Sequence, residues 1–244
     1  MGRFYVSAEF VKGNKIVIAG TEAHHILEVM RLRKLDKVVA FDGTGKEYIG
    51  FITDIKKKAL EVEIVETRAP VSLSNSRLTL IQALPKKERM ESIVEKATEL
   101  GVSALVPVIT GRTIPKWTDP KRRERVSRWR KIALEASKQC GRPDIPFVKE
   151  IGDLAGAIKD SSDYDLCLIA ALSDEAILLK DAISGFKGGK VAIAIGPEGD
   201  FTPDEIALAR NAGFKLVNLG PRVLKSDTAG LAVLAILNYE FQDR

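Results

Sequence analysis

The chain has 244 residues, with 38 Lys and Arg against 33 Asp and Glu, a net charge of +5 and 45% hydrophobic residues. This composition is typical of a soluble globular protein, and the length lets one or two domains bury a core without disulfides or a structural metal. Two cysteines without a C-x-x-C pair exclude a disulfide framework and a cysteine zinc site. The longest apolar stretch, residues 229–237, is far below the roughly 18 residues of a membrane span. The N-terminus lacks the apolar core of a signal peptide, so we expect a cytoplasmic protein.

Short strands and turns dominate residues 3–71, with a hairpin turn at 42–45. One helix interrupts them, and Thr21 is its expected N-cap. Arg31 and Arg33 lie near the end of this helix. We predict a small β-barrel domain over residues 1–71 and place the domain boundary in the polar segment 71–76.

From residue 77 onward, apolar strands alternate with helices, which predicts an α/β domain over 77–244 with a parallel sheet covered on both faces. Helices are expected near 88–100, 119–140, 203–211 and 228–241. The last of these is apolar around most of its circumference. It is expected to be buried, either in the centre of the monomer or at a subunit interface.

Positive charge is concentrated in residues 112–142, which hold 11 basic and 3 acidic side chains. In the expected helix 119–140, Val126 and Trp129 belong to an apolar stripe that faces inward. Arg122, Arg125 and Arg128 fall mostly off that stripe. One interpretation is a solvated helix face, and the other is a track that binds the phosphates of a polyanion.

The loop Gly196-Pro197-Glu198-Gly199-Asp200-Phe201 follows an expected strand, at the sheet edge where open α/β sheets bind ligands. Thr202, Pro203 and Glu205 then form the pattern of a capping box at a helix start. The two acidic residues of the loop argue against a phosphate cradle and favour a neutral or cationic ligand. The alternative is a tight turn before a well-capped helix.

The next loop, residues 219–228, joins a Gly-Pro-Arg turn to Lys225, Ser226, Asp227 and Thr228. Asp227 or Ser226 is a candidate N-cap for the last helix, which would be a structural role only. The two histidines are adjacent, at 24 and 25, and neighbouring helical positions point about 100° apart. We therefore expect the histidines to lie on the surface or to pack in the barrel, and no metal site or Ser-His-Asp triad.

Several of these segments resemble one family. The loop 196–201, Leu219-Gly220-Pro221-Arg222 with Leu224, and the stretches 86–101 and 135–142 are similar to the RsmE family of 16S rRNA (uracil-N3)-methyltransferases, in the SPOUT superfamily. The resemblance covers essentially the whole chain. It departs from the family at Lys225 and Asp227, where Arg and Glu are common.

The resemblance implies a PUA-like β-barrel in front of a trefoil-knotted methyltransferase domain, and a homodimer. It also implies S-adenosylmethionine as cofactor and N3 of a uridine in small-subunit (16S) rRNA as methyl acceptor. Because that nitrogen is protonated at neutral pH, a base or a stabilising cation is needed. Arg222 and Lys225 are the expected cations, and Asp227 is expected to accept the proton or to orient Thr228.

The expected cofactor-binding residues are Leu172, Ile195, Gly196, Pro197, Glu198, Gly199, Leu219, Gly220, Leu224 and Thr228. The expected RNA-binding residues are Arg31, Arg33, Arg112, Arg122, Arg125, Arg128 and Arg142. The alternatives are a SPOUT methyltransferase that acts on another RNA, and a non-catalytic RNA-binding or ribosome-assembly protein. A nucleotide-dependent oxidoreductase is disfavoured because no G-x-G-x-x-G fingerprint is present.

Overall fold

The structure is a computed structural model that describes residues 3–57, 59–69, 76–87 and 89–242. It divides into two compact units, residues 1–71 with 137–145 and residues 72–136 with 146–244. The segment 137–145 therefore groups with the first unit, where the Arg3 guanidinium donates to the Gly141 carbonyl. The sequence pattern predicts this segment as part of the second domain, residues 77–244. The boundary expected at 71–76 lies outside the described residues except for Ser76, which begins a strand.

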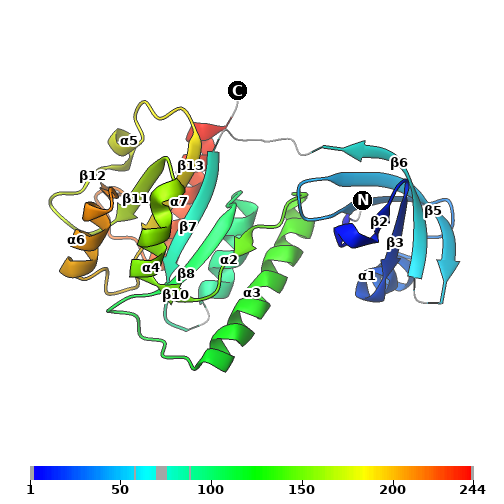
Figure 1. Cartoon of the computed structure of the whole chain (residues 1–244), viewed down its shortest axis with the longest axis horizontal. Helices are drawn as coiled ribbons and strands as arrows, with labels where there is room; N and C mark the ends of the chain where they lie inside the picture. Colours follow the sequence, from blue (N-terminus) through cyan, green and yellow to red (C-terminus); the bar gives the residue numbers. More distant parts are fainter. Residues whose placement is uncertain (1–2, 58, 70–75, 88, 243–244) are drawn as a thin grey trace. The chain divides into compact units, whose positions relative to one another are not determined.

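The first unit contains one six-stranded sheet (Figure 1). In spatial order its strands are β1 (Arg3–Tyr5), β4 (Lys37–Phe41), β5 (Glu47–Lys56), β6 (Ala59–Arg68), β3 (Lys15–Ala19) and β2 (Val11–Lys12). Only the β1–β4 pair is parallel among these ladders. Alternate residues face the core, so that Ile16 and Ile18 of β3 are buried while their neighbours are exposed.

A short helix follows β3. It begins as α1 (Gly20–His24) and continues as a π-helical turn over His25–Val29. The prediction that Thr21 caps this helix is wrong, because Ala19 occupies the N-cap and no side chain caps it. The backbone φ of Gly20 is +66°, a value that glycine adopts without strain and that turns the chain from the strand into the helix.

The second unit contains an eight-stranded sheet in which every described pair is parallel. In spatial order its strands are β10 (Gly152–Asp153), β8 (Ala104–Ile109), β7 (Ser76–Ala83), β13 (Gly189–Ile195), β11 (Leu166–Ala170), β14 (Lys215–Asn218) and β12 (Ile177–Leu178), with β9 (Phe147–Val148) paired to β8. This confirms the parallel α/β domain that the apolar strands predict.

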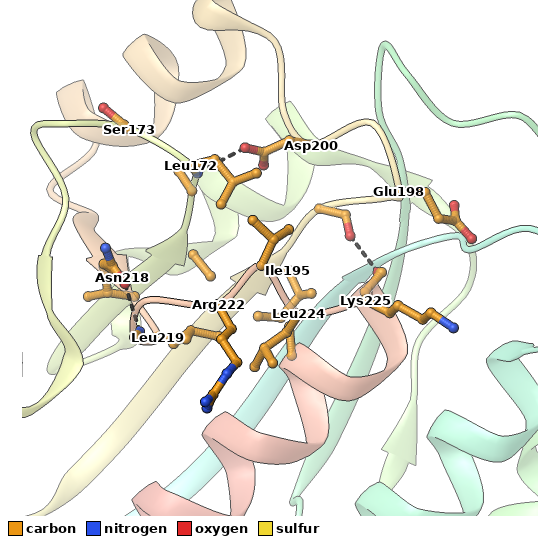
Figure 2. Close-up of a pocket in the computed structure, with 18 of the residues that line it drawn as sticks. Leu172, Ser173, Ile195, Glu198, Asp200, Asn218, Leu219, Arg222, Leu224 and Lys225 are labelled. Atoms are coloured by element: carbon orange, nitrogen blue, oxygen red, sulfur yellow. Dashed lines mark hydrogen bonds between the residues drawn. The ribbon is translucent and has the colours of Figure 1, made fainter.

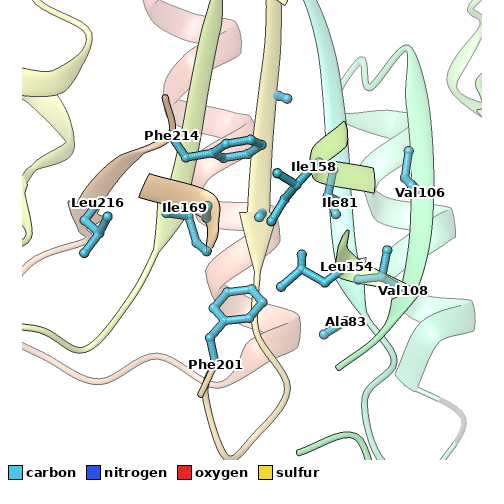
Figure 3. Packing of buried hydrophobic residues seen from close by; sticks show 13 residues of the cluster. Ile81, Ala83, Val106, Val108, Leu154, Ile158, Ile169, Phe201, Phe214 and Leu216 are labelled. Carbon is cyan, nitrogen blue, oxygen red and sulfur yellow. The ribbon is translucent and has the colours of Figure 1, made fainter. Parts of the chain in front are cut away.

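Helices cover both faces of this sheet. They are α2 (Arg89–Glu99), α3 (Asp119–Cys140), α4 (Leu154–Lys159), α5 (Leu179–Ala182), α6 (Pro203–Asn211) and α7 (Ser226–Phe241), with a 3-10 turn at Asp160–Asp163. The other 3-10 turn, Ala8–Phe10, belongs to the first unit. Ile81 and Ala83 of β7 join a buried cluster with Leu154 and Ile158 of α4 (Figure 3). Leu80 and Gln82 point to the opposite face, toward Gly230 of α7.

Of the two helices with distinctive sequence patterns, α3 is packed as expected, whereas α7 is buried on one side only. In α3, Val126 and Trp129 are buried, as the apolar stripe predicts. In α7, one side is buried around Val233 and Leu237, whereas the side chain of Tyr239 is 78% exposed. The final helix is therefore packed in the unit on one side and uncovered on the other.

Candidate functional site

A cavity of about 840 Å³ lies at the carboxyl-end edge of the second sheet (Figure 2). Three loops line it, following β11, β13 and β14. These strands are neighbours, since β11 pairs with both β13 and β14, and Ala170 stands opposite both Ile195 and Val217. Parallel strands end at the same edge, so loops that are far apart in sequence meet there. The cavity is lined by 170–174, 195–198, 200, 217–226 and 229.

The acidic residues of the 196–201 loop hold the loops together. The Glu198 carboxylate accepts a hydrogen bond from the Lys86 backbone N–H at 3.0 Å. Asp200 has φ +61° and accepts from the backbone N–H groups of Leu172, at 2.9 Å, and Phe201, at 2.8 Å. Both carboxylates are thus engaged by backbone donors, and the expectation that this loop is not a phosphate cradle stays a prediction.

The helix after this loop begins as the sequence predicts. Thr202 is the N-cap of α6, and its hydroxyl and the Glu205 carboxylate form a reciprocal capping box. Glu205 also accepts from the Gly111 N–H at 2.8 Å. Arg112 donates to the carbonyl of Gly199 at 2.6 Å, so the segment after β8 helps to hold the 196–201 loop in place.

The loop after β14 is shaped by a local turn. The Asn218 side chain accepts from the Gly220 N–H at 2.7 Å, and Gly220 has φ +117°. Beyond this turn the side chain of Val223 is 75% exposed. In the described part of the chain the side chains of Arg222 and Lys225 make no hydrogen bond or ion pair, and both residues line the cavity (Figure 2).

The last helix starts differently from the expectation. Lys225 occupies the N-cap position of α7 and no side chain caps the helix, so the prediction of a Ser226 or Asp227 cap is wrong. The Ser226 hydroxyl instead donates to the Gly196 carbonyl at 2.5 Å and accepts from the Gln82 amide at 2.9 Å. Sequence reasoning missed Gln82, and the signal for it was a lone amide inside an apolar strand.

Eight of the ten expected cofactor residues line the cavity: Leu172, Ile195, Gly196, Pro197, Glu198, Leu219, Gly220 and Leu224. Gly199 and Thr228 do not line it. Gly199 faces Arg112, which an added Cβ would meet at 3.4 Å. Thr228 is an exposed residue of α7.

Asp227 also lies outside the cavity lining, beside a cation that sequence reasoning missed. Arg89 Nη1 lies 3.6 Å from Asp227 Oδ1 and 4.0 Å from Glu198 Oε1. Arg89 therefore places positive charge between the loop after β13 and the start of α7. Its position at the first residue of α2 brings it to the same sheet edge as the cavity.

Several expected RNA-binding arginines are engaged within the protein. Arg125 and Arg128 both pair with Glu91, at 3.2 and 2.7 Å, and Arg125 also stacks over Trp117. Arg122 donates to the Trp117 carbonyl at 3.1 Å. In the first unit, Arg142 is bound to the Asp144 carboxylate.

Other basic side chains remain open to solvent. Arg31 and Arg33 are exposed near the end of the π-helical turn, and their side chains make no hydrogen bond or ion pair in the residues that the structure describes. Arg123 and Lys131 of α3 are exposed in the same way. Arg123 and Lys131 were not among the predicted RNA-binding residues, because helix periodicity does not show which cations a neighbouring helix neutralises.

Within the described ranges, no three His, Cys, Asp or Glu side chains come together in a group able to hold a metal ion. None of the described helices combines the length and apolarity of a membrane span.

Both units of the chain are similar to known proteins. Residues 72–238 match a family model described as an RNA methyltransferase domain, and residues 18–65 match one described as an RNA methyltransferase PUA domain. Proteins named ribosomal RNA small subunit methyltransferase E are similar in sequence. That of Bacillus subtilis is 29% identical, with 91% of this chain and 89% of the relative covered. That of Mycobacterium tuberculosis is 30% identical, with 95% and 88% covered.

Two solved structures are similar over nearly the whole chain. A methyltransferase of Legionella pneumophila in complex with S-adenosylmethionine is 31% identical, with a TM-score of 0.86 and coverage of 99% of this chain and 98% of that chain. The ribosomal RNA small subunit methyltransferase E of Neisseria gonorrhoeae, bound to S-adenosylmethionine, is 32% identical with the same TM-score and coverage.

The parallel α/β domain and its edge cavity, together with the PUA domain, define an RNA methyltransferase. More particularly, the chain belongs to the ribosomal RNA small subunit methyltransferase E family. The resemblance to the RsmE family is thereby confirmed. The trefoil knot that it implies stays a prediction.

Proposed function

We propose that this enzyme transfers a methyl group from S-adenosylmethionine to N3 of a uridine in 16S rRNA of the small ribosomal subunit. The observation that carries the proposal is the cavity formed by the three loops, in a chain similar along nearly its full length to two structures bound to that donor. Such a substrate places the enzyme in the cytoplasm.

The residues that line the cavity fit an adenosine that carries a sulfonium. Ile195, Leu219 and Leu224 supply apolar surface for an adenine ring. The Gly196 carbonyl and the Gly220 N–H are already bonded within the protein, so other backbone groups of these loops would hydrogen-bond the ring edge. The loop after β13 carries the acidic residues Glu198 and Asp200, which suit a cationic ligand. Bound in the cavity, the donor supplies an electrophilic methyl group.

The chain's own cations are suited to activating the acceptor. Arg222 and Lys225 line the cavity and have no anionic partner in the described residues. They would stabilise the uridine anion that forms when N3 loses its proton. Asp227 would accept that proton or orient Thr228, and the Arg89 guanidinium lies 3.6 Å from its carboxylate.

RNA binding is assigned to both units. Arg31 and Arg33 offer unpaired charge in the domain of residues 1–71, and α3 offers further cations in the domain of residues 77–244. The set predicted from sequence also includes Arg112, Arg122, Arg125, Arg128 and Arg142. The arginines of this set that are bound to carboxylates contribute less free charge to RNA binding. The target base must be unpaired or extruded for N3 to be reached.

A second copy of the chain completes the proposed assembly. The uncovered side of α7, with Ile236 43% and Tyr239 78% exposed, is the apolar surface proposed for the homodimer. Light scattering of the purified protein tests this, and a monomer at micromolar concentration would contradict it.

The decisive experiment incubates the protein with labelled S-adenosylmethionine and small subunits from cells that lack the activity. Nucleoside analysis should find label in 3-methyluridine from 16S rRNA. Label in another nucleoside or another RNA would favour a SPOUT enzyme with a different target. A protein that binds RNA but not the donor would be a non-catalytic assembly protein.

A further inference from the structure

A buried chain of hydrogen bonds runs from the centre of the sheet to the cavity. The Gln82 Nε2 donates to Ser226 Oγ at 2.9 Å, and Ser226 Oγ donates to the Gly196 carbonyl at 2.5 Å. Gln82 has no exposed surface and Ser226 is 6% exposed. Ser226 and Gly196 line the cavity, whereas Gln82 lies behind them.

This chain of hydrogen bonds joins β7, the loop after β13 and the start of α7 at one point. Gln82 stands near the end of β7 and pairs with Ile195, the last residue of β13, so Gly196 begins its loop directly beside it. The peptide between Gly196 and Pro197 has no N–H, because proline lacks one. Its carbonyl is therefore the only backbone group through which this peptide can be fixed. Ser226 supplies that bond from the first residue of α7.

The amide is kept in place although it is costly to bury. Its Nε2 makes a second bond to the Ala83 carbonyl at 3.0 Å, while Oε1 has no hydrogen-bond partner. A Cβ at Gly230 would lie 3.0 Å from that oxygen, so the glycine of α7 leaves room for it. An apolar residue at position 82 would avoid an unpaired buried oxygen. The presence of a glutamine at this position points to a role in placing its partners.

We propose that Gln82 is a positioning residue for the donor site. Through Ser226 it fixes the Gly196 carbonyl and the start of α7, and with them Leu224 and Lys225, which line the cavity. This inference rests on the proposed function, because it assumes that the cavity takes S-adenosylmethionine.

The test measures donor binding by calorimetry, without RNA. Gln82→Met and Ser226→Ala should each weaken S-adenosylmethionine binding about tenfold, as the loss of a buried hydrogen bond predicts. The double variant should bind S-adenosylmethionine about as tightly as the weaker-binding single variant, since both substitutions break the same chain of hydrogen bonds. Ser226→Thr keeps the hydroxyl and should retain affinity.

Thr98→Val is the matched control. Thr98 is a fully buried hydroxyl in the same unit that donates to the Val94 carbonyl within α2. This variant should lower thermal stability and leave donor affinity unchanged. Hydrogen exchange of donor-free protein gives a second readout. The Ala229 amide, which donates to the Lys225 carbonyl at 2.7 Å, should exchange faster in Gln82→Met and Ser226→Ala but not in Thr98→Val.

The outcomes separate this inference from the function it assumes. Wild-type protein that does not bind S-adenosylmethionine would overturn the proposed function. Wild-type binding with near-normal affinity in Ser226→Ala would overturn the positioning role alone, as would additive losses in the double variant. If Gln82→Met does not fold, the comparison of Ser226→Ala with Ser226→Thr decides the question.

Discussion

Arg89 Nη1 lies 3.6 Å from Asp227 Oδ1, and this oxygen makes no hydrogen bond in the described structure. The contact is an ion pair between the start of α2 and the start of α7. The same guanidinium lies 4.0 Å from Glu198 Oε1 in the loop after β13. One cation thus faces two segments of the proposed active site.

Arg89→Met should slow methyl transfer about tenfold in single turnover, a size typical of a lost charged contact. The reason is that the Asp227 carboxylate would lose the group that orients it. Donor affinity should change less, because Glu198 keeps its bond to the Lys86 N–H. Arg89→Lys retains the charge and should recover most of the rate. Equal rates in wild type and Arg89→Met would show that Arg89 does not contribute to methyl transfer.

Gly196→Asp should weaken donor binding at least about tenfold by calorimetry. An added Cβ at this position would lie 3.2 Å from Asp200 Oδ1 and 3.3 Å from the Phe201 ring, so the loop must shift. A second carboxylate beside Asp200 adds repulsion. Gly152→Ala is the control, since a Cβ there meets no atom within 4 Å. Unchanged affinity in Gly196→Asp would show that the donor site is elsewhere.

Arg222→Met and Lys225→Met should each slow single-turnover methyl transfer, by about tenfold or more if they stabilise the developing anion. Saturating donor concentrations isolate this effect from binding. Lys180→Met removes a similar exposed charge from α5 and should have no effect. Normal rates in both cavity variants would rule out anion stabilisation by these side chains.

Replacing Arg31 and Arg33 by Gln should reduce the salt dependence of RNA binding. Each lost phosphate contact lowers the slope of log K against log salt by about one unit or slightly less. Arg68→Gln is the control in the same unit, because Arg68 already pairs with Glu66 at 2.7 Å. An unchanged slope in the Arg31 and Arg33 double variant would place the RNA on another surface.

The first unit should lose stability in alkaline solution. Burial, followed by the hydrogen bond that its hydroxyl donates to Asp42, raises the pKa of Tyr48 from 10.0 to about 12. A group whose folded pKa is raised contributes its full stability below the unfolded pKa and loses it as pH rises through the folded one. The free energy of unfolding should therefore decline between about pH 10 and 12.

Urea unfolding followed by circular dichroism measures this effect. Tyr48→Phe should be less stable than wild type at pH 8, because the Asp42 bond is lost, but should lose less stability on going to pH 11. Tyr5→Phe, from the same unit, should keep the wild-type pH dependence. Parallel curves for wild type and Tyr48→Phe would show that Tyr48 does not cause the alkaline loss.

Local patterns in the sequence were enough to predict much of the architecture. Continuous apolar strands between helices indicate a parallel sheet, and helix 119–140 matches α3. The Thr202 capping box depends on residues three apart, so it can be recognised without tertiary structure. The position of the cavity followed from the rule that parallel strands end at one edge.

Contacts between distant segments were decided only by the tertiary structure. Gln82 and Ser226 are 144 residues apart, and nothing in either segment indicates their hydrogen bond. Ser226 was one of two candidates to cap its own helix, but its hydroxyl donates a hydrogen bond to the Gly196 carbonyl instead. Likewise, helix periodicity marks Arg125 as surface charge, while Glu91 of a neighbouring helix neutralises it. Sequence spacing determines which face a side chain occupies, and only the packing of the elements determines which partner it meets there.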